Sequence, residues 1–475
     1  MKQFALAIAL VSTGFSAIGQ KAAWNWYFGD HAGITFSSGA PVALTDGVLN
    51  TFEGVATISD TAGQLLFYTD GITVYNRNHQ AMPNGSGLLG DPSATQSGII
   101  VQAPLSDSLY FVFTIDYNMG SNGLRYSVVD MSLDGGLGNV IEKNTLVRSN
   151  AKEKITAARH ANGIDFWILI NDWTSDDIFS YHLSSNGLDL TPVQSSVGPF
   201  HGGVLSDALG YMKVNRLNNR LALALWNKNR FTLLDFDNAT GLCSNKIELQ
   251  GNSSNLYKTY GVEFSPDGTM LYGTTMASPF KVLQFNLLAG TAIDVFNSRV
   301  ILESTASAPP SCTGGSSYHF GALQLGPDGL IYGVSNCESY LNSISNPDSL
   351  GSACGYSPQS VSLPIGVGKL GLPNFVSDFI LPNVTTGSLE LEDALPAIAA
   401  YPNPSSGLWN LRFNAHTITG NLEVLDNSGR VVMRDVILTN ATHHVLSSSS
   451  LTVGTYICRI RWGSEIRHIR LTANL

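Results

Sequence analysis

A strand–turn–strand pattern recurs six times between residues 54 and 333, and it constrains the fold more than any other feature of the sequence. In each copy an apolar strand is followed by a tight polar turn and a second strand rich in aromatic and β-branched residues. The copies cover residues 54–68, 101–112, 156–167, 212–222, 262–273 and 323–333. Their turns lie about 45 to 61 residues apart, which is close to the period of one β-propeller blade.

The two ends of this repetitive region complete one another. Residues 371–377 have the pattern of a first, innermost strand with no strands after it, whereas 24–28, 34–36 and 42–44 are strand-like runs without a first strand. Joined, they make one blade, and a ring closed in this way leaves no long exposed sheet edge. The sequence therefore predicts an all-β fold with a seven-bladed β-propeller over residues 20–382. Six or eight blades also fit, because one of the loops is long.

The N-terminus is typical of a cleavable export signal. A positively charged start is followed by an apolar run at residues 4–15 and by small residues. Ala17 and Gly19 fit the −3 and −1 positions of a cleavage site, so residues 1–19 are expected to be a signal peptide that is cut before Gln20. The apolar run is too short for a membrane-spanning helix, which needs ~20 residues. The sequence contains no other candidate for a transmembrane segment.

The last part of the chain differs from the rest in composition. Residues 383–397 are rich in Thr, Ser and acidic residues and are expected to form an exposed linker. The segment 398–475 contains no lysine, and its cations are arginines. Short strand-like runs lie at 409–413, 422–425, 431–433, 455–460 and 466–471. Short strands packed so closely along the chain predict a small Ig-like β-sandwich.

Three motifs in this C-terminal segment resemble those of the type IX (Por) secretion sorting domain, which is found in Bacteroidetes. Residues 401–407 (YPNPSSG) resemble the opening motif, 422–432 (LEVLDNSGRVV) the middle motif and 451–457 (LTVGTYI) the late motif. All three stand in the expected order. In one departure, such domains usually close with a lysine before the last strand, where this chain has Arg467 and Arg470.

The resemblance implies Sec export to the periplasm followed by type IX secretion. The protein is then expected to be secreted or attached to the outer surface, with the secretion machinery as its partner. The implied sorting residues are Pro402, Asn403, Pro404, Gly407, Gly429, Gly454 and Tyr456. Proline fixes φ and removes a backbone donor, and glycine permits a tight hairpin turn. A β-sandwich appendage without a sorting role is the alternative.

The repetitive region also resembles a known group. Residues 67–71, 154–163 and 371–375 resemble segments of YVTN or WD40-like propellers, which are common in exported Bacteroidetes proteins beside the sorting domain. The resemblance covers most of residues 24–381. Because its motifs are turn and strand patterns, it implies a fold and not an activity.

Charge and cysteine content exclude several kinds of site. The net charge of −10 argues against nucleic acid as a partner, because phosphate binding needs clustered Lys and Arg. None of the five cysteines lies in a CxxC pair, so we expect no zinc site. Cys312, Cys337 and Cys354 lie close together in the sequence, and we predict one disulfide, between Cys337 and Cys354, with at least one free thiol in the chain.

The sequence contains no motif of a metallohydrolase, serine hydrolase, nucleotide-binding loop or EF-hand. We therefore predict no catalytic, cofactor-binding or metal-ligating residue and no cofactor. His160 ends an innermost strand and His201 lies in a loop; both are interpreted as turn residues rather than ligands of a central channel. Asp60, Asp267 and Asp328 precede turns and are interpreted as turn formers, with loop-bound calcium as the alternative.

Several tryptophans allow two interpretations. Packing between blades is the commoner role of such side chains, and a sugar-stacking platform is the other. The residues concerned are Trp24, Trp26, Trp167, Trp173 and Trp226.

Three functions remain open from the sequence. The first is a non-enzymatic secreted or surface propeller that binds an unknown extracellular glycan, peptide or protein through one rim, and it predicts a rim patch without clustered carboxylates. The second is a hydrolase or lyase that degrades an extracellular polymer, and it requires carboxylates that converge at the channel mouth. The third is a structural envelope or gliding-related protein. An enzyme is the less favoured interpretation.

Overall fold

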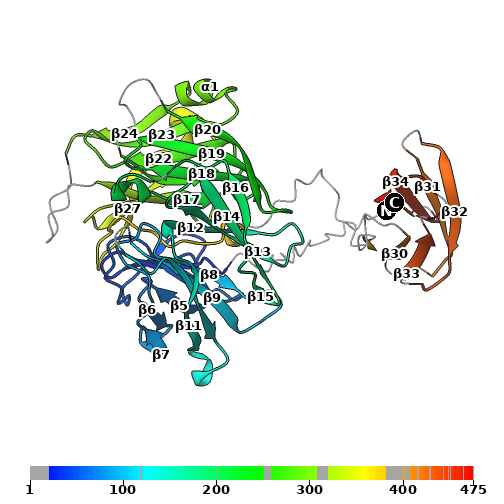
Figure 1. The fold of residues 1–475 in the computed structure, drawn as a ribbon, viewed down its shortest axis with the longest axis horizontal. Coiled ribbons are helices and arrows are strands. Elements are labelled where there is room, and N and C mark those ends of the chain that lie inside the picture. Colours follow the sequence, from blue (N-terminus) through cyan, green and yellow to red (C-terminus); the bar gives the residue numbers. More distant parts are fainter. Residues whose placement is uncertain are drawn as a thin grey trace, which may run out of the picture. The chain divides into compact units, whose positions relative to one another are not determined.

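The chain folds into two compact units of antiparallel strands, divided between Asn383 and Val384. The computed structural model describes residues 21–380 and 399–473, apart from 118–119, 201, 251–257, 308–318, 402–406, 414–416, 427–428, 442, 448, 450 and 464. Figure 1 colours the first unit from blue to yellow and the second in orange and red. The predicted all-β class is confirmed.

The described strands of the first unit form seven antiparallel sheets, each built from strands that follow one another along the chain. Sheet 1 contains β1 (Asn25–Phe28), β2 (Ala32–Thr35) and β3 (Val42–Leu44). Sheet 2 contains β4 (Ala56–Ser59), β5 (Leu65–Thr69), β6 (Thr73–Asn76) and β7 (Ala81–Ser86). Sheet 3 contains β8 (Gly98–Gln102), β9 (Leu109–Ile115), β10 (Leu124–Asp130) and β11 (Asn139–Arg148). Sheet 4 contains β12 (Ala151–Arg159), β13 (Phe166–Asp172), β14 (Asp177–Ser184), β15 (Gly187–Leu188) and β16 (Val193–Ser196).

The remaining sheets of the first unit repeat this plan. Sheet 5 contains β17 (Met212–Val214), β18 (Arg220–Leu225), β19 (Arg230–Asp237) and β20 (Leu242–Leu249). Sheet 6 contains β21 (Thr259–Phe264), β22 (Met270–Thr275), β23 (Phe280–Asn286) and β24 (Val300–Thr305). Sheet 7 contains β25 (Phe320–Leu325), β26 (Ile331–Ser335), β27 (Tyr340–Ile344) and β28 (Tyr356–Ser362). The short helical elements are α1 (Ala292–Asn297), η1 (Asp134–Gly136), η2 (Leu205–Ala208), η3 (Gly351–Cys354) and η4 (Ser377–Phe379).

The Pro-Asp-Gly turns join the first two strands of sheets 6 and 7. Gly268 has φ +74° and its N–H donates to the carbonyl of Ser265 at 2.9 Å. Asp267 accepts the N–H of Thr269 at 2.9 Å, so it stabilises the turn as predicted. Residues with a side chain rarely adopt such a φ, which explains the glycine that recurs in this pattern.

The first strands of successive sheets pack against one another. β1 contacts β4, β4 contacts β8, β8 contacts β12, β12 contacts β17, β17 contacts β21 and β21 contacts β25. The last sheet contacts the first through β28 and β3. All residues of β4, β21 and β25 are buried. The first strands therefore form the interior of the unit.

Residues 366–380 are here called the closing segment, and within it residues 371–377 were expected to supply an innermost strand to sheet 1. The structure gives this segment isolated bridges instead, from Val367 to Asp30 and from Pro373 to Val55, and sheet 1 keeps three strands. Proline has no N–H to donate to a ladder, which limits pairing at this point. The segment still ties the ends of the unit together, because the N–H of Ala322 in sheet 7 donates to the carbonyl of Leu370 at 2.8 Å.

The second unit contains two sheets that share one core. One sheet has the order β29 (Ala399–Tyr401), β30 (Leu408–Arg412), β33 (His443–Ser447). The other has the order β32 (Val431–Ile437), β31 (Gly420–Leu425), β34 (Gly454–Trp462), β35 (Glu465–Ala473). Trp409 of the first sheet and Val424 and Cys458 of the second are fully buried in the same cluster. Each of the five strands predicted from the sequence is present.

The predicted disulfide between Cys337 and Cys354 is wrong. Cys337 is disulfide-bonded, but Cys354 is a free, buried thiol. Cys354 ends η3, and its thiol interacts with the hydroxyl of Tyr272, which gives it a partner other than sulfur. Spacing in the sequence permitted the bond, but pairing depends on geometry. Among the described residues, no helix has the length and apolar character needed to cross a membrane.

Candidate functional site

The closing segment lies among the first strands of the first unit. The side-chain amide of Asn374, which is 2% exposed, donates to the carbonyl of Ile155 at 2.9 Å and to that of Gly98 at 3.3 Å. The hydroxyl of Ser377 donates to the carbonyl of Asn215 at 3.3 Å. These contacts reach sheets 3 and 4 and the end of β17 in sheet 5. The interior is therefore filled by the chain itself.

Two buried carboxylates stand at one end of the first strands. Glu53 accepts a hydrogen bond from the hydroxyl of Tyr260 at 3.0 Å. Glu153 accepts the N–H and the hydroxyl of Thr95 at 2.7 and 2.9 Å. Burial, and next the charge of Glu153, raise the pKa of Glu53 well above its usual range. Both groups have partners inside the protein, so they belong to its framework.

Two buried lysines complete this interior. Lys154 donates to the carbonyls of Ala208 and Leu209, and burial lowers its pKa to about 7. Lys213 donates to the side-chain oxygen of Gln324 and lies 3.6 Å from Glu263. Their ammonium groups are held by groups of the protein and leave no open charge for a ligand.

At the opposite ends of the first strands, a largely buried ion pair joins β12 to the closing segment. Arg159, the last residue of β12, donates from Nε to the carboxylate of Asp378 and from Nη1 to the carbonyl of Gly163 at 3.1 Å. Its guanidinium also lies over the rings of Phe166 and Phe379, at 4.8 and 5.5 Å. Burial raises the pKa of Asp378, and the charge of Arg159 acts against that rise.

A pocket opens beside this ion pair, between sheets 2 and 3. Its volume is about 420 Å³, which is within the range of small-molecule sites. We call it the rim pocket. It is lined by Ala22, Ile58, Ser59, Asp60, Thr61, Gln102, Asp107, Tyr110, Arg159 and Phe379.

The rim pocket contains polar groups with unused hydrogen-bonding capacity. Asp60 accepts the N–H groups of Ala62 and Gln64 through Oδ1, at 2.8 and 2.9 Å. Its Oδ2 and both oxygens of Asp107 make no hydrogen bond to any residue that the structure describes. The hydroxyl of Tyr110 likewise has no such partner, although only 5% of this residue is exposed. Burial, followed by the charges of Asp60 and Asp107, raises the pKa of Tyr110 to about 12, so the phenol stays protonated at neutral pH.

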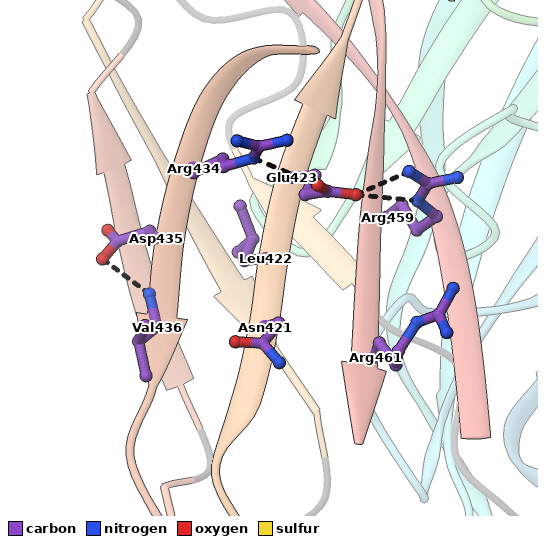
Figure 2. A pocket seen from close by; sticks show the side chains of 8 residues that line it. All are labelled: Asn421, Leu422, Glu423, Arg434, Asp435, Val436, Arg459 and Arg461. Carbon is purple, nitrogen blue, oxygen red and sulfur yellow. Dashed lines mark hydrogen bonds and ion pairs between the residues drawn. The ribbon is translucent and has the colours of Figure 1, made fainter. Parts of the chain in front are cut away.

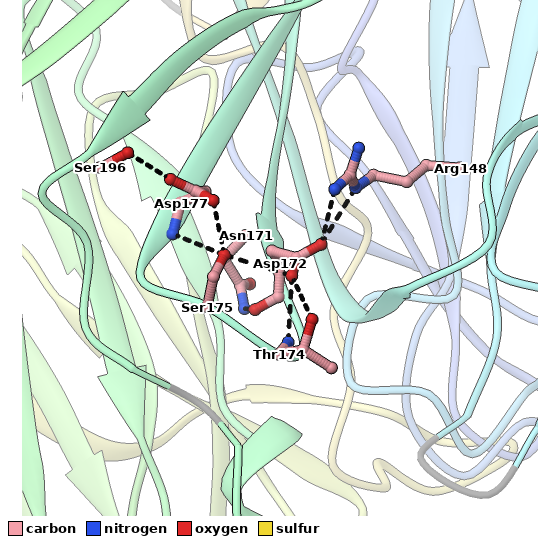
Figure 3. A network of polar contacts seen from close by, with 7 residues as sticks. All are labelled: Arg148, Asn171, Asp172, Thr174, Ser175, Asp177 and Ser196. Atoms are coloured by element: carbon pink, nitrogen blue, oxygen red, sulfur yellow. Dashed lines mark hydrogen bonds and ion pairs between the residues drawn. The ribbon is translucent and has the colours of Figure 1, made fainter.

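A further polar network joins sheets 3 and 4 (Figure 3). Arg148 donates to Oδ1 of Asp172 from Nε and Nη2, at 3.0 and 2.9 Å. The other oxygen of Asp172 accepts the N–H and hydroxyl of Thr174, and Asp177 accepts the hydroxyl of Ser175 at 2.7 Å. Burial acts to raise the pKa of Asp172, but these hydrogen bonds hold it below its usual value. Since both oxygens of Asp172 are occupied, the network braces a turn and is not a ligand site.

In the second unit, a carboxylate lies between two arginines on the outer face of its larger sheet (Figure 2). Glu423 of β31 accepts from Arg459 of β34 at 2.5 and 3.2 Å and from Arg434 of β32 at 3.2 Å. The hydrogen bond from Arg459, more than any other contact, lowers the pKa of Glu423. Arg461 and Asn421 lie on the same face and line the same shallow hollow. The face therefore carries more positive than negative charge.

The sequence of the second unit decides its family. Residues 399–471 match the family described as the secretion system C-terminal sorting domain. This part of the chain is a type IX sorting domain. It directs export, so the protein is secreted or held at the cell surface, and it engages the type IX machinery. The recognition of this domain and the predicted localisation are confirmed.

The sorting motif is only partly described by the structure. Pro402, Asn403 and Pro404 lie outside the described residues, as do Gly19 and Gln20 of the expected signal cleavage site.

The other sorting residues lie at strand ends or in a strand. Gly407 immediately precedes β30, and Gly454 begins β34. Gly429, with φ +82°, donates to the carbonyl of Asp426 at 2.9 Å in the turn between β31 and β32. Tyr456 is buried and donates to the carbonyl of Thr452 at 2.7 Å.

The chain has structural neighbours but no curated relative. No curated protein matches the sequence. A protein from Lactobacillus plantarum is 11% identical with a TM-score of 0.44, and the match covers 74% of this chain and 98% of that one. A functionally unknown protein from Desulfotomaculum acetoxidans is 13% identical with a TM-score of 0.43 and the same coverage of 74% and 98%. Virginiamycin B lyase from Staphylococcus aureus is 9% identical with a TM-score of 0.36, covering 66% and 85%. These neighbours are propeller-like proteins.

The histidines and tryptophans singled out from the sequence do not form a site. His160 accepts the N–H of Asn162 at 3.0 Å, which makes it a turn residue, and its ring lies 5.4 Å from that of Trp167. Trp26, Trp167 and Trp226 are buried, so they offer no sugar-stacking platform. Trp24 and Trp173 are half-buried, and neither lines the rim pocket. His201 lies outside the described residues.

The rim pocket was missed from the sequence. Its members come from separate turns and carry no motif, and among the described residues no group of three or more His, Cys, Asp or Glu could hold a metal ion.

Proposed function

We propose that the first unit is a non-enzymatic binding module that holds an extracellular ligand at the rim pocket, after export directed by the sorting domain. In this proposal residues 1–19 are a signal peptide cut before Gln20, 20–382 are a seven-bladed β-propeller, 383–397 are a linker and 398–475 are an Ig-like sorting domain. The cycle of contacts from sheet 1 to sheet 7 and back supports the propeller and its blade number.

The observation that carries the proposal is the contrast between a filled interior and an open rim. The closing segment occupies the interior, where Asn374 bonds to carbonyls of two different sheets. At the rim, Asp107 and the hydroxyl of Tyr110 face a pocket of about 420 Å³ without a hydrogen-bond partner in the described chain. Unpaired polar groups in a concave site favour ligand binding.

The arrangement of carboxylates favours binding over catalysis. A hydrolase or lyase needs an acid and a base of different pKa within reach of one bond. Glu53 and Glu263 have raised pKa values, but both are buried and hydrogen-bonded to groups of the protein. Asp60 and Asp107 lie in the open pocket, where the structure provides neither of them with an activating partner. The described residues therefore offer a contact surface and no catalytic pair.

The test uses the full mature protein purified from the host. It is applied to arrays of extracellular glycans and peptides, alongside the Asp107→Asn variant, and in parallel it is incubated with soluble polysaccharides while released reducing ends are measured. We expect a bound ligand that Asp107→Asn weakens and no release of products. Turnover of a polysaccharide, or a ligand that Asp107→Asn leaves unaffected, would contradict the proposal.

A further inference from the structure

The charges around the rim pocket restrict the class of ligand. Asp60 and Asp107 present carboxylate oxygens that accept hydrogen bonds, and Arg159 presents a guanidinium on another wall. An anionic ligand would face two carboxylates that have no cationic partner in the described chain. Arg159 is already paired with Asp378, so it adds a hydrogen-bond donor to the wall without an uncompensated positive charge. A neutral ligand that both donates and accepts hydrogen bonds satisfies all three groups.

The shape of the pocket adds a second restriction. Phe379, Ile58 and Tyr110 also line the pocket, but they are only 7%, 2% and 5% exposed and offer little apolar contact area. Phe379 packs edge-on against Phe166 with ring centroids 5.7 Å apart, so its position is fixed. The groups open to a ligand are therefore mainly polar, which suits a ligand that carries several hydroxyl groups, such as a sugar.

The hydroxyl of Tyr110 is the most informative group. Only 5% of Tyr110 is exposed, yet its hydroxyl has no partner in the described chain. This hydroxyl is not among the enclosed polar atoms that lack a partner, so it is open to the pocket and can bond to a ligand. Because its pKa is raised to about 12, it is available as a neutral donor and acceptor. A ligand hydroxyl placed between Tyr110 and Asp107 would satisfy it.

We propose that the rim pocket binds a neutral sugar residue of an extracellular glycan, with its hydroxyl groups on Asp60, Asp107 and Tyr110. This inference rests on the proposed binding function and names the ligand class. The carboxylates accept from two sugar hydroxyls, the phenol bridges a third, and Arg159 donates to a sugar oxygen. The chemistry involves no covalent step.

The experiment uses the full mature protein with defined probes. Binding of glucose, galactose, mannose, cellobiose and lactose is followed by saturation-transfer NMR and titration, with glucuronate and a lysine-rich peptide as charged comparisons. We expect a neutral sugar to bind. Asp107→Asn should weaken that binding roughly 10- to 100-fold, because it removes a charged acceptor, and Tyr110→Phe roughly 2- to 10-fold. Asp134→Asn, an exposed aspartate in η1 outside the pocket, should leave it unchanged.

The outcomes separate this inference from the proposed function. If none of the neutral sugars binds, or if a sugar binds equally to the wild type and both pocket variants, the sugar assignment is wrong. If instead the peptide or glucuronate binds and Asp107→Asn abolishes that binding, the sugar assignment fails while a binding role for the rim pocket stands. If the only ligands found on the arrays are insensitive to both pocket variants, the proposed function fails as well.

Discussion

Arg159 and Asp378 form an ion pair across 219 positions of sequence, joining the end of β12 to η4 of the closing segment. Asp378 is 2% exposed in its side chain and Arg159 is 27% exposed. The pair anchors the closing segment at the wall of the rim pocket, so the position of this segment and the shape of the pocket depend on the same contact.

Replacing Arg159 by leucine should destabilise the first unit, because it leaves the Asp378 carboxylate buried without its partner. Breaking one side of a buried pair costs about 3 kcal/mol. The pKa of Asp378 is already raised by burial and will rise further without Arg159. A carboxyl group with a raised folded-state pKa lowers the free energy of unfolding as pH rises through that pKa, because ionisation then favours the unfolded chain. The destabilisation caused by Arg159→Leu should therefore be larger at pH 7.5 than at pH 5. Chemical denaturation at both pH values measures this.

Arg220→Leu provides the control for that measurement, because Arg220 forms a partly exposed pair with Asp235 at 3.6 Å. A pair of this kind contributes up to about 1 kcal/mol. Equal effects of the two substitutions, or a loss at Arg159 that does not depend on pH, would show that the pair with Asp378 is not an anchor.

Replacing Glu53 by glutamine should stabilise the first unit at neutral pH. The folded-state pKa of Glu53 is raised, first by burial and then by Glu153, so ionisation costs folding free energy as pH rises from the unfolded-state pKa through the folded-state pKa. Glutamine keeps an oxygen for the hydroxyl of Tyr260. We expect a higher thermal midpoint than the wild type at pH 8 and no gain near pH 4, where both states are protonated. A lower midpoint at pH 8 would mean that Glu53 is ionised and stabilising.

Replacing Trp409 by alanine should impair both the stability of the sorting domain and export. Trp409 is fully buried in its core, and such truncations cost about 3 to 5 kcal/mol. Trp409→Phe is the milder comparison, because it keeps ring packing and removes an indole N–H that has no partner among the described groups. Secreted yield should fall strongly with alanine and little with phenylalanine. Equal secreted yields of the alanine and phenylalanine variants would show that export does not depend on the stability of this domain.

Thiol labelling tests the revised cysteine assignment. After unfolding without a reductant, alkylation should label Cys243, Cys354 and Cys458 and leave Cys337 unlabelled. In the native protein labelling should be slow, because burial raises the pKa of Cys243 and of Cys458 to about 12 and disfavours the reactive thiolate. Peptide mapping gives the answer, and a Cys337–Cys354 crosslink would contradict the structure.

Local sequence patterns predicted much of the fold. The Pro-Asp-Gly turns gave the hairpins β21–β22 and β25–β26, because only glycine tolerates the positive φ of Gly268 and Gly329 at low cost. Alternating apolar residues in the last 80 positions gave the strands of the sorting domain. Each of these features is decided within a few residues of the chain.

The rim pocket and the closing segment could not be predicted in this way. The pocket combines Asp60, Tyr110, Arg159 and Phe379, which come from four distant segments and meet only after the sheets and the closing segment have packed together. Cys354 failed as a predicted disulfide partner for the same reason, since its burial beside Tyr272 depends on packing between sheets. Local sequence patterns do not predict features that depend on contacts between distant parts of the chain.

The most direct test of the account is fractionation of the native host carrying the full chain or a chain that lacks residues 398–475, with mass spectrometry of the mature termini. We expect the protein with its C-terminal domain outside the cell, beginning at Gln20, and the truncated protein retained in the periplasm. Truncated protein on the cell surface or in the medium would contradict the central claim that the C-terminal domain directs export.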